Sequence, residues 1–176
     1  MTVKNYRFSA LGLCLLVCTF MFNCENNKGS KTFEPISWEE RNAVIPTDST
    51  TIHGETYLSV YSEIYSLTDL RTHALTATVS LRNVSQTETI VIEGANYYNT
   101  NGDLTREYVK TPIYIKPMET LEIVIAENDI EGGTGGNFMF DWYTPKNCPE
   151  PLFEAIMIST TGQQGISFTS VGHRIK

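Results

Sequence analysis

The stretch EGGTGGNFMFDW, residues 131–142, joins a cluster of glycines to an alternating apolar strand and indicates how the chain folds. Phe138, Phe140 and Trp142 occupy every second position, a period typical of a β-strand with one face in a core. Glycine loses more backbone entropy on folding than any other residue, so this cluster suggests positive φ angles or the close approach of another backbone. We therefore predict a structural turn, the glycine loop (residues 131–137), that sets the register of the strand and is fixed by side-chain hydrogen bonds of Asn137.

The same period of two extends over most of the chain from about residue 50. It is clearest in 56–66, 74–82 and 121–125, and the segment 56–66 places Tyr57, Tyr61 and Tyr65 on one face. We expect hairpins across Asn99–Asp103, which contains Asn-Gly, and between 154–159 and 165–170.

No segment carries a convincing helical period, and turn residues separate the short apolar stretches. The pattern predicts an all-β fold, an antiparallel immunoglobulin-like β-sandwich of about eight or nine strands. A partly closed β-barrel is the alternative. The Cys…Trp…Cys pattern is missing, which excludes a true antibody-type domain.

The N-terminus predicts export. Lys4 and Arg7 precede the apolar run 10–22, which at 1.5 Å per residue is too short for a bilayer core of roughly 30 Å. Cys24 follows directly, and a cysteine between an apolar run and a polar segment is typical of a bacterial lipoprotein signal. We therefore expect a signal peptide at 1–23, acylation of Cys24, a flexible tether at 24–49 and a β-sandwich domain at 50–176. An ordinary cleaved signal is the alternative.

Within the tether, we expect a short helical turn at Trp38 and 39–41, packed on the edge of the domain. Cys148 is the one thiol left once Cys14 and Cys18 leave with the signal and Cys24 is acylated, so no internal disulfide is expected. Its proline-rich surroundings predict a partly exposed loop cysteine.

Charge narrows the classes of partner. The whole chain has a formal charge of −7, and removal of 1–23 takes away two cations and no anion, which leaves 11 Lys and Arg against 20 Asp and Glu. The resulting charge of −9 argues against binding to nucleic acid or to anionic lipid headgroups.

Five stretches resemble the bacterial family known as domain of unknown function 3124. They are YLSVYSEIY (57–65), LRN (81–83), YYNTNG (97–102), the block 127–142 and GISF (165–168). The resemblance implies an exported, often lipid-anchored β domain over most of 55–175. It implies no catalytic residue.

Patterns that would indicate catalysis or a bound cofactor are missing from the sequence. His53, His73 and His173 have no metal-ligand spacing, and there is no Gly-x-Ser-x-Gly motif. The glycine loop lacks the Lys-Ser/Thr ending and the following helix of a phosphate-binding loop. The acids 127–131 do not have the spacing of a twelve-residue calcium loop, so a solvated acidic turn is favoured. We expect no catalytic residue, metal or cofactor.

Two hypotheses of different classes follow. The first is a non-enzymatic module of the cell envelope, held to the membrane through its lipidated N-terminus, that binds another protein or a glycan through its loops and exposed aromatics. Its candidate aromatic contacts are Tyr57, Tyr61 and Tyr65, with Tyr97 and Tyr98 as further options.

The second hypothesis is an extracytoplasmic hydrolase or ligand-binding enzyme that uses the glycine loop together with the strand after it (residues 131–143), with Asp141 and Glu131 as acid or base. The candidate loop residues for either hypothesis are Glu131, Gly132, Gly133, Thr134, Gly135, Gly136, Asn137 and Asp141.

Overall fold

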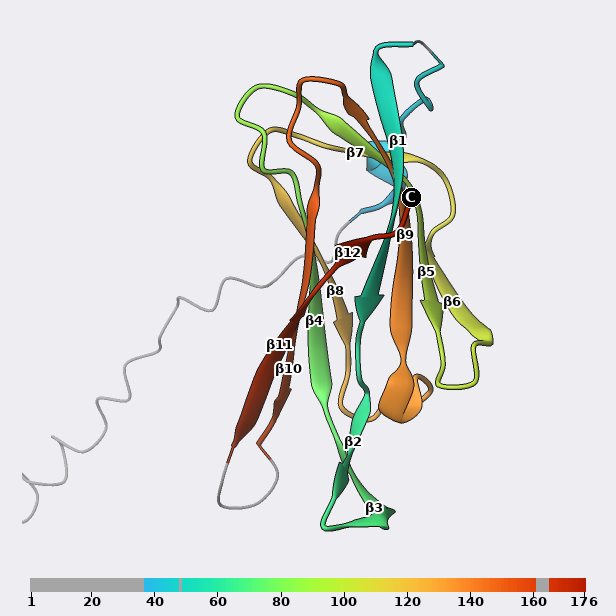
Figure 1. Cartoon of the computed structure of the whole chain (residues 1–176), viewed down its shortest axis with the longest axis vertical. Helices are drawn as coiled ribbons and strands as arrows, with labels where there is room; N and C mark the ends of the chain where they lie inside the picture. The colour runs from blue at the N-terminus through green and yellow to red at the C-terminus, as the bar shows by residue number, and fades with distance from the viewer. Residues whose placement is uncertain (1–36, 48, 161–164) are drawn as a thin grey trace, which may run out of the picture. The chain divides into compact units, whose positions relative to one another are not determined.

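Alternating apolar residues build two antiparallel β-sheets that face each other across a common core (Figure 1). This computed structural model describes residues 37–47, 49–160 and 165–176. The six-stranded sheet has the order β12 (His173–Arg174), β1 (Thr51–Ser59), β9 (Asn137–Pro145), β5 (Ile90–Tyr98) and β6 (Leu104–Val109), with β7 (Ile113–Ile115) also paired to β5. The four-stranded sheet has the order β11 (Ile166–Val171), β10 (Leu152–Ser159), β4 (Thr76–Arg82) and β8 (Thr120–Ile125).

A separate pair of strands, β2 (Glu63–Ser66) and β3 (Thr68–Ala74), forms a hairpin that we call the arm (residues 63–74). The predicted antiparallel sandwich is confirmed, and the two sheets do not join into a closed barrel in the described part of the chain. There are twelve strands there rather than eight or nine, chiefly because the arm and the two-residue β12 add short strands.

The aromatic side chains of β9 lie at the centre of the core, as predicted. Phe138, Phe140 and Trp142 are fully buried, and Phe140 stacks on Phe153 of the opposite sheet with ring centroids 4.2 Å apart. Burial of a large apolar side chain stabilises the fold by roughly 1.5–3 kcal/mol. The Trp142 indole N–H donates to Thr56 Oγ1 at 2.9 Å, so its polar group is also satisfied inside the core.

Close packing of β1 against β9 fixes the register of the six-stranded sheet. Gly54 lies opposite Trp142, and a Cβ at Gly54 would come within 2.2 Å of the indole ring. In this register Glu55 lies opposite Asp141 and His53 lies opposite Tyr143. These residues alternate with the buried ones, so they lie on the outer face of the sheet.

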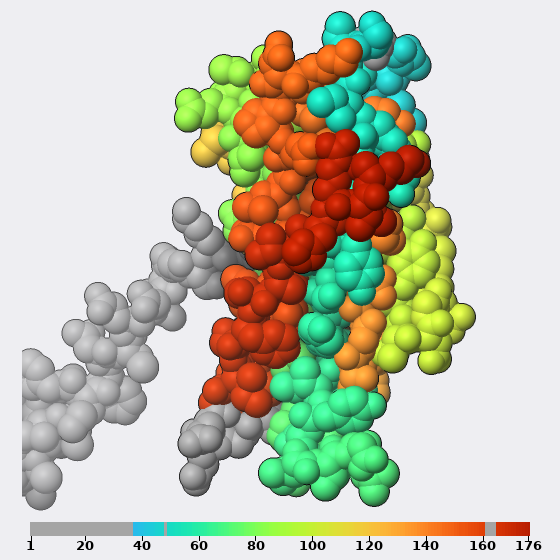
Figure 2. All heavy atoms as spheres, viewed as in Figure 1, coloured from blue at the N-terminus to red at the C-terminus, as the bar shows by residue number. Residues whose placement is uncertain are grey.

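The prediction of one strand over 56–66 is wrong. The strand ends at Ser59, because Val60 N–H donates to the carbonyl of Gly136 and Ser62 N–H donates to that of Gly133, both outside any ladder. The chain then enters the arm, which lies at the end of the molecule near η2 (Gly133–Gly135) and projects from the sandwich (Figures 1 and 2). Tyr57, Tyr61 and Tyr65 therefore do not share one face of a strand.

The predicted helical turn near Trp38 is confirmed as the 3₁₀-helix η1 (Glu39–Arg41). Trp38 packs against the core, and Arg41 makes a bidentate ion pair with Glu119 at 3.0 and 2.7 Å. Contacts with the sandwich thus reach into the segment expected as a tether. The predicted signal peptide (residues 1–23) and Cys24 lie outside the described residues. Within the ranges 37–47, 49–160 and 165–176, no helix has the length and apolar character needed to cross a bilayer.

Candidate functional site

The glycine loop packs against the end of the sandwich so closely that Gly132 and Gly136 have no room for a side chain. A Cβ on Gly132 would lie 1.8 Å from the hydroxyl oxygen of Tyr97, and one on Gly136 would lie 2.7 Å from the carbonyl oxygen of Val60. Gly133 has a φ of +67°, a conformation that side chains disfavour. The loop includes the 3₁₀-helix η2, which the sequence analysis did not predict.

Hydrogen bonds tie the loop to the β5–β6 hairpin. The Thr100 hydroxyl donates to the carbonyl of Gly132 at 3.0 Å and accepts from the N–H of Gly135 at 2.8 Å. The Asn137 amide donates to the carbonyl of Gly135 at 3.4 Å, in line with the predicted role of Asn137. The unusual composition of the loop is therefore explained by packing around Tyr97 and Thr100.

Asp129, just before the glycine loop, and Glu131, its first residue, both form ion pairs with Arg106. Arg106 donates to Asp129 at 2.8 Å, to Glu131 at 3.0 Å and to the hydroxyl of Tyr108 at 2.7 Å. The hydrogen bond to Asp129 is the largest of the effects that raise the pKa of Arg106. Burial raises the pKa of Tyr108. The Glu131 carboxylate thus forms an ion pair with Arg106 and does not contact Asp141.

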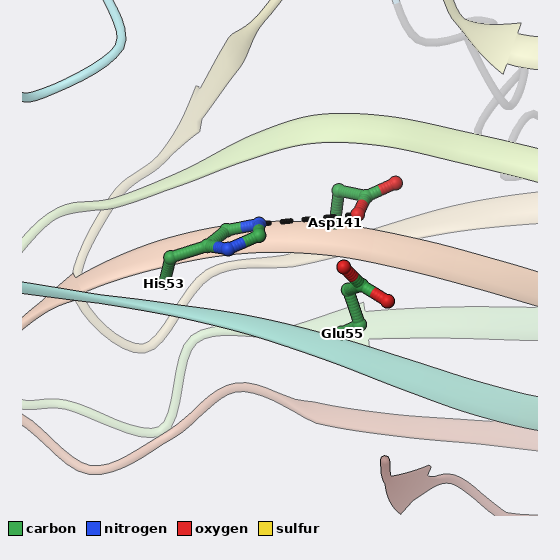
Figure 3. A group of neighbouring side chains, drawn as sticks. All are labelled: His53, Glu55 and Asp141. Carbon is green, nitrogen blue, oxygen red and sulfur yellow. Dashed lines mark ion pairs between the residues drawn. The ribbon is translucent and has the colours of Figure 1, made fainter. Parts of the chain in front are cut away.

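Asp141 lies on the outer face of the six-stranded sheet, where it meets two residues of β1. His53, Glu55 and Asp141 form what we call the His53 cluster, and one ligand atom from each lies within 4.8 Å of the others (Figure 3). His53 Nε2 is 3.9 Å from Asp141 Oδ1, beyond hydrogen-bonding distance. All three side chains are partly exposed, by 32%, 24% and 31% respectively.

Further charged and aromatic side chains surround the cluster. Tyr143 packs on the His53 ring with centroids 4.7 Å apart, and Lys176 Nζ donates to Glu55 Oε1 at 2.6 Å. The pKa of Asp141 is raised, first by burial and then by the negative charges of Glu55 and Glu93. Burial, followed by Glu93, also raises the pKa of Tyr143.

A surface depression of about 380 Å³ opens beside the cluster. It is lined by His53, Glu93, Gly94, Asn96, Glu107, Val109, Lys110 and Asp141. A bulge in β5 at Glu93 places Gly94 opposite Asp141, and the missing side chain leaves space above the sheet. The depression gives a small ligand or ion access to the cluster from solvent.

The candidate tyrosines have different surroundings. Tyr57 on β1 is 37% exposed and Tyr65 in the arm is 62% exposed, whereas Tyr61 is half-buried against Phe168. Tyr97 is fully buried, so its prediction as an exposed contact is wrong, and Tyr98 is half-buried.

The arm carries the most exposed leucines of the described residues. Leu67 is 90% exposed and Leu70 is 92% exposed, close to Tyr65 in the same hairpin. Leu67 has a φ of +65°, unusual for a residue with a side chain, at the turn between β2 and β3.

The family model described as "Protein of unknown function (DUF3124)" matches residues 53–175. The chain belongs to this family. The matched range includes the glycine loop, the arm and all three residues of the His53 cluster. A solved structure titled "Crystal Structure of Thermotoga maritima 1070" is similar over 68% of this chain and 92% of that chain, with 12% identity and a TM-score of 0.45. Comparison with curated proteins gives no match.

In this DUF3124 domain, Cys148 is buried rather than partly exposed as predicted. Its side chain is 8% exposed, and the thiol donates to the carbonyl of Pro149 at 3.3 Å. A cavity of about 910 Å³ lies beside it, between the loop that follows β4 and the loop that follows β9. Pro145 is the last residue of β9, and in the turn that follows the N–H of Cys148 donates to the carbonyl of Pro145 at 2.9 Å.

Sequence reasoning missed the His53 cluster of the DUF3124 domain. His53 and Glu55 are two residues apart on one strand, and Asp141 comes from the strand beside it, 86 positions along the chain from Glu55. No local spacing signals such a group. The alternation in 51–59 places His53 and Glu55 on one face, but only the pairing of β1 with β9 adds Asp141.

Proposed function

We propose that this DUF3124 protein is a cell-envelope lipoprotein, acylated at Cys24, whose sandwich domain is a non-enzymatic module that binds another envelope protein through the arm. The observation that carries the binding role is the exposure of Leu67, Leu70 and Tyr65 in one hairpin. This hairpin projects from the sandwich (Figure 2). Large apolar side chains gathered on a surface mark interaction sites, whereas scattered single ones need no explanation.

The arm holds its shape through its own hydrogen bonds. Across the hairpin, the Thr72 hydroxyl donates to Glu63 at 2.7 Å, and near the turn the Leu70 N–H donates to Thr68 Oγ1 at 3.2 Å. At its base, Leu75 N–H donates to the carbonyl of Ser62. A preformed hairpin loses little conformational entropy when it binds, which favours affinity.

The chemistry of the arm favours a protein partner over a glycan. Leu67 and Leu70 offer aliphatic surface with no hydrogen-bonding group, which suits an apolar pocket on a protein. Tyr65 adds a rigid amphipathic ring of the kind enriched at protein interfaces. Thr68, Asp69 and Arg71 are exposed beside the leucines, but the arm offers the single ring of Tyr65 for stacking on a sugar.

Site-specific photocrosslinking in intact cells tests the binding role. A photoreactive residue at Leu67 or Leu70 should give a discrete crosslinked protein, whereas the same residue at Met118, which is 64% exposed in the loop after β7, should not. Equal crosslinking from all three positions, or none from the arm, would contradict a docking role.

Membrane attachment is supported by the sequence and tested separately. Each buried CH₂ of an acyl chain contributes about 0.8 kcal/mol, so a multiply acylated terminus anchors stably. With Cys24→Ser we expect loss of incorporated fatty-acid label and release of the protein from the membrane fraction. Retention of label by this variant would place the modification elsewhere.

The enzymatic alternative stays a prediction with weaker support. It requires Asp141 and Glu131 to act on one substrate beside the glycine loop, yet Glu131 pairs with Arg106 while Asp141 faces His53. Backbone N–H groups of the loop are engaged too, since that of Gly135 donates to Thr100. The geometry therefore favours the binding module.

A further inference from the structure

We infer that His53, Glu55 and Asp141 form a binding site for a divalent transition-metal ion, with Zn²⁺ as the best match. The site is independent of the arm and lies on the outer face of the six-stranded sheet (Figure 3).

The first argument is geometric. Glu55 and Asp141 are directly opposite in the β1–β9 ladder, and His53 lies on the same face two residues earlier, so the backbone brings three ligands of different types together. Ligand atoms in a tetrahedral zinc site lie about 2.0–2.2 Å from the ion and hence about 3.4 Å from one another. The three atoms here lie within 4.8 Å, so small side-chain rotations, without backbone movement, bring them to that spacing.

The second argument is the state of the histidine. Its Nε2 atom is shielded from solvent, points toward Asp141 and has no hydrogen-bond partner among the described residues (Figure 3). A polar atom that is shielded from water and has no partner is a cost to the fold. A metal ion between Nε2 and Asp141 would remove this cost by taking the lone pair of the neutral imidazole.

The third argument is the local charge. Glu55 lies opposite Asp141 in the β1–β9 ladder, and Glu93 lines the depression together with Asp141. Glu107 also lines the depression. The cations nearby include Lys110, which lines the depression, Lys176, whose ammonium contacts Glu55, and Arg174, whose guanidinium donates to the carbonyl of His53. A divalent ion bound directly by the carboxylates would relieve their crowding more effectively than these side chains.

The donor set selects the class of ion. One imidazole and two carboxylates suit Zn²⁺ and neighbouring first-row metals, whereas Ca²⁺ and Mg²⁺ prefer oxygen ligands throughout. Three protein ligands would leave a fourth position for water or another small ligand, and the depression lined by His53 and Asp141 is open to solvent. Lys176 Nζ, 65% exposed, holds Glu55 and would have to release it when an ion binds.

Calorimetric titration of the full chain in detergent with ZnCl₂ tests the site. We expect one ion bound per chain, with affinity at least tenfold weaker in His53→Ala and in Asp141→Asn. His73→Ala removes an imidazole of the arm and should leave the affinity unchanged. Lys176→Ala should strengthen binding by a few-fold, because it removes a competitor for Glu55.

Melting curves recorded with a chelator measure the effect of each substitution on folding separately from its effect on metal binding. His53→Ala and Asp141→Asn alter a surface cluster and should melt within a few degrees of the wild type without metal. Absence of Zn²⁺ binding to the wild type at micromolar concentrations would overturn the inference. So would stoichiometric binding that survives both variants, since the ion would then lie elsewhere.

Discussion

The glycine loop leads into β9, the His53 cluster takes Asp141 from the middle of that strand, and the two regions differ in how they use unusual residues. Before β9 begins, the loop shows the most anomalous composition in the chain, yet its glycines pack against Tyr97, Thr100 and Val60. In the middle of β9, Asp141 looks ordinary in sequence but meets His53 and Glu55. Among the described residues, both His53 Nε2 and the Tyr97 hydroxyl beside the glycines are buried without a hydrogen-bond partner. The composition anomaly thus reports a backbone constraint, and it is the grouping of an imidazole with two carboxylates that points to a ligand.

Gly132→Ala should give the largest effect that separates the two regions. A Cβ at Gly132 would lie 1.8 Å from the Tyr97 hydroxyl oxygen and 2.8 Å from Ser62 Oγ, and the buried tyrosine has little room to move. We expect the free energy of unfolding to fall by about 3 kcal/mol, measured by chemical denaturation.

Two variants check that this loss comes from the Tyr97 contact. Gly165→Ala, whose Cβ would meet only Ser159 O at 3.7 Å, should change the free energy of unfolding by less than about 0.5 kcal/mol. In a Tyr97→Phe background, the cost of Gly132→Ala should fall by about 1 kcal/mol or more. A Gly132→Ala protein as stable as wild type would show that the loop is not a packing element.

Gly136→Ala and Gly135→Ala should show which contacts of the glycine loop contribute most to stability. The Cβ at Gly136 would lie 2.7 Å from the backbone oxygen of Val60, which cannot rotate away, whereas that at Gly135 would lie 3.2 Å from a Thr100 methyl group. We expect losses of about 2 kcal/mol and less than about 1 kcal/mol respectively, from thermal or chemical unfolding. The reverse order would mean that the contacts with β5–β6 matter more than those with Val60.

Arg106→Met should lower stability less than Gly132→Ala or Gly136→Ala does. It removes the ion-pair partner of Asp129 and Glu131. Asp129 and Glu131 would lose their shared cation, and we expect stability to fall by about 1 kcal/mol, given the partial exposure of the arginine. The loss should shrink when the melting temperature is measured in high salt, because salt screens the repulsion between the two carboxylates. A loss independent of salt would assign the role of Arg106 to its contact with Tyr108.

The sequence was sufficient for features that depend on local alternation. Phe138, Phe140 and Trp142 could be placed in the core because a period of two determines the face of a strand. The Asn99–Asp103 hairpin followed from its Asn-Gly turn, and Gly102 has the expected positive φ, +85°.

Features that depend on which strands pair could not be predicted. In the sequence, the strand-like alternation continues past Ser59. In the structure the strand ends there, because the N–H groups of Val60 and Ser62 donate to the glycine loop instead. Tyr97 is buried because the bulge between Ile92 and Gly94 shifts the alternation of β5, so that Ala95 and Tyr97 face the core and Tyr97 stacks on Phe138 with ring centroids 4.7 Å apart. The His53 cluster needed the β1–β9 register, a contact between distant parts of the chain.

Asp141→Asn should give the smallest change in the free energy of unfolding. The change should be a gain in stability, whereas the glycine-loop variants lose stability. Burial and then Glu55 and Glu93 raise the pKa of Asp141 above its ordinary value of 3.8, so the folded protein disfavours the carboxylate. A raised folded pKa in an acid costs stability above that pKa, and the cost disappears as the pH falls below the ordinary value. With chelator present, Asp141→Asn should therefore be more stable than wild type at pH 7, by less than about 1 kcal/mol, and equally stable at about pH 3.5.

Denaturation curves at the two pH values measure this difference, with Asp129→Asn as the matched control. Asp129 accepts from Arg106, so removal of its charge should lower stability at pH 7. If Asp141→Asn were also less stable at pH 7, Asp141 would be a structural acid like Asp129. A gain in stability would instead mark Asp141 as a residue held at a cost to the fold, which is what a ligand-binding position on an otherwise well-packed strand requires.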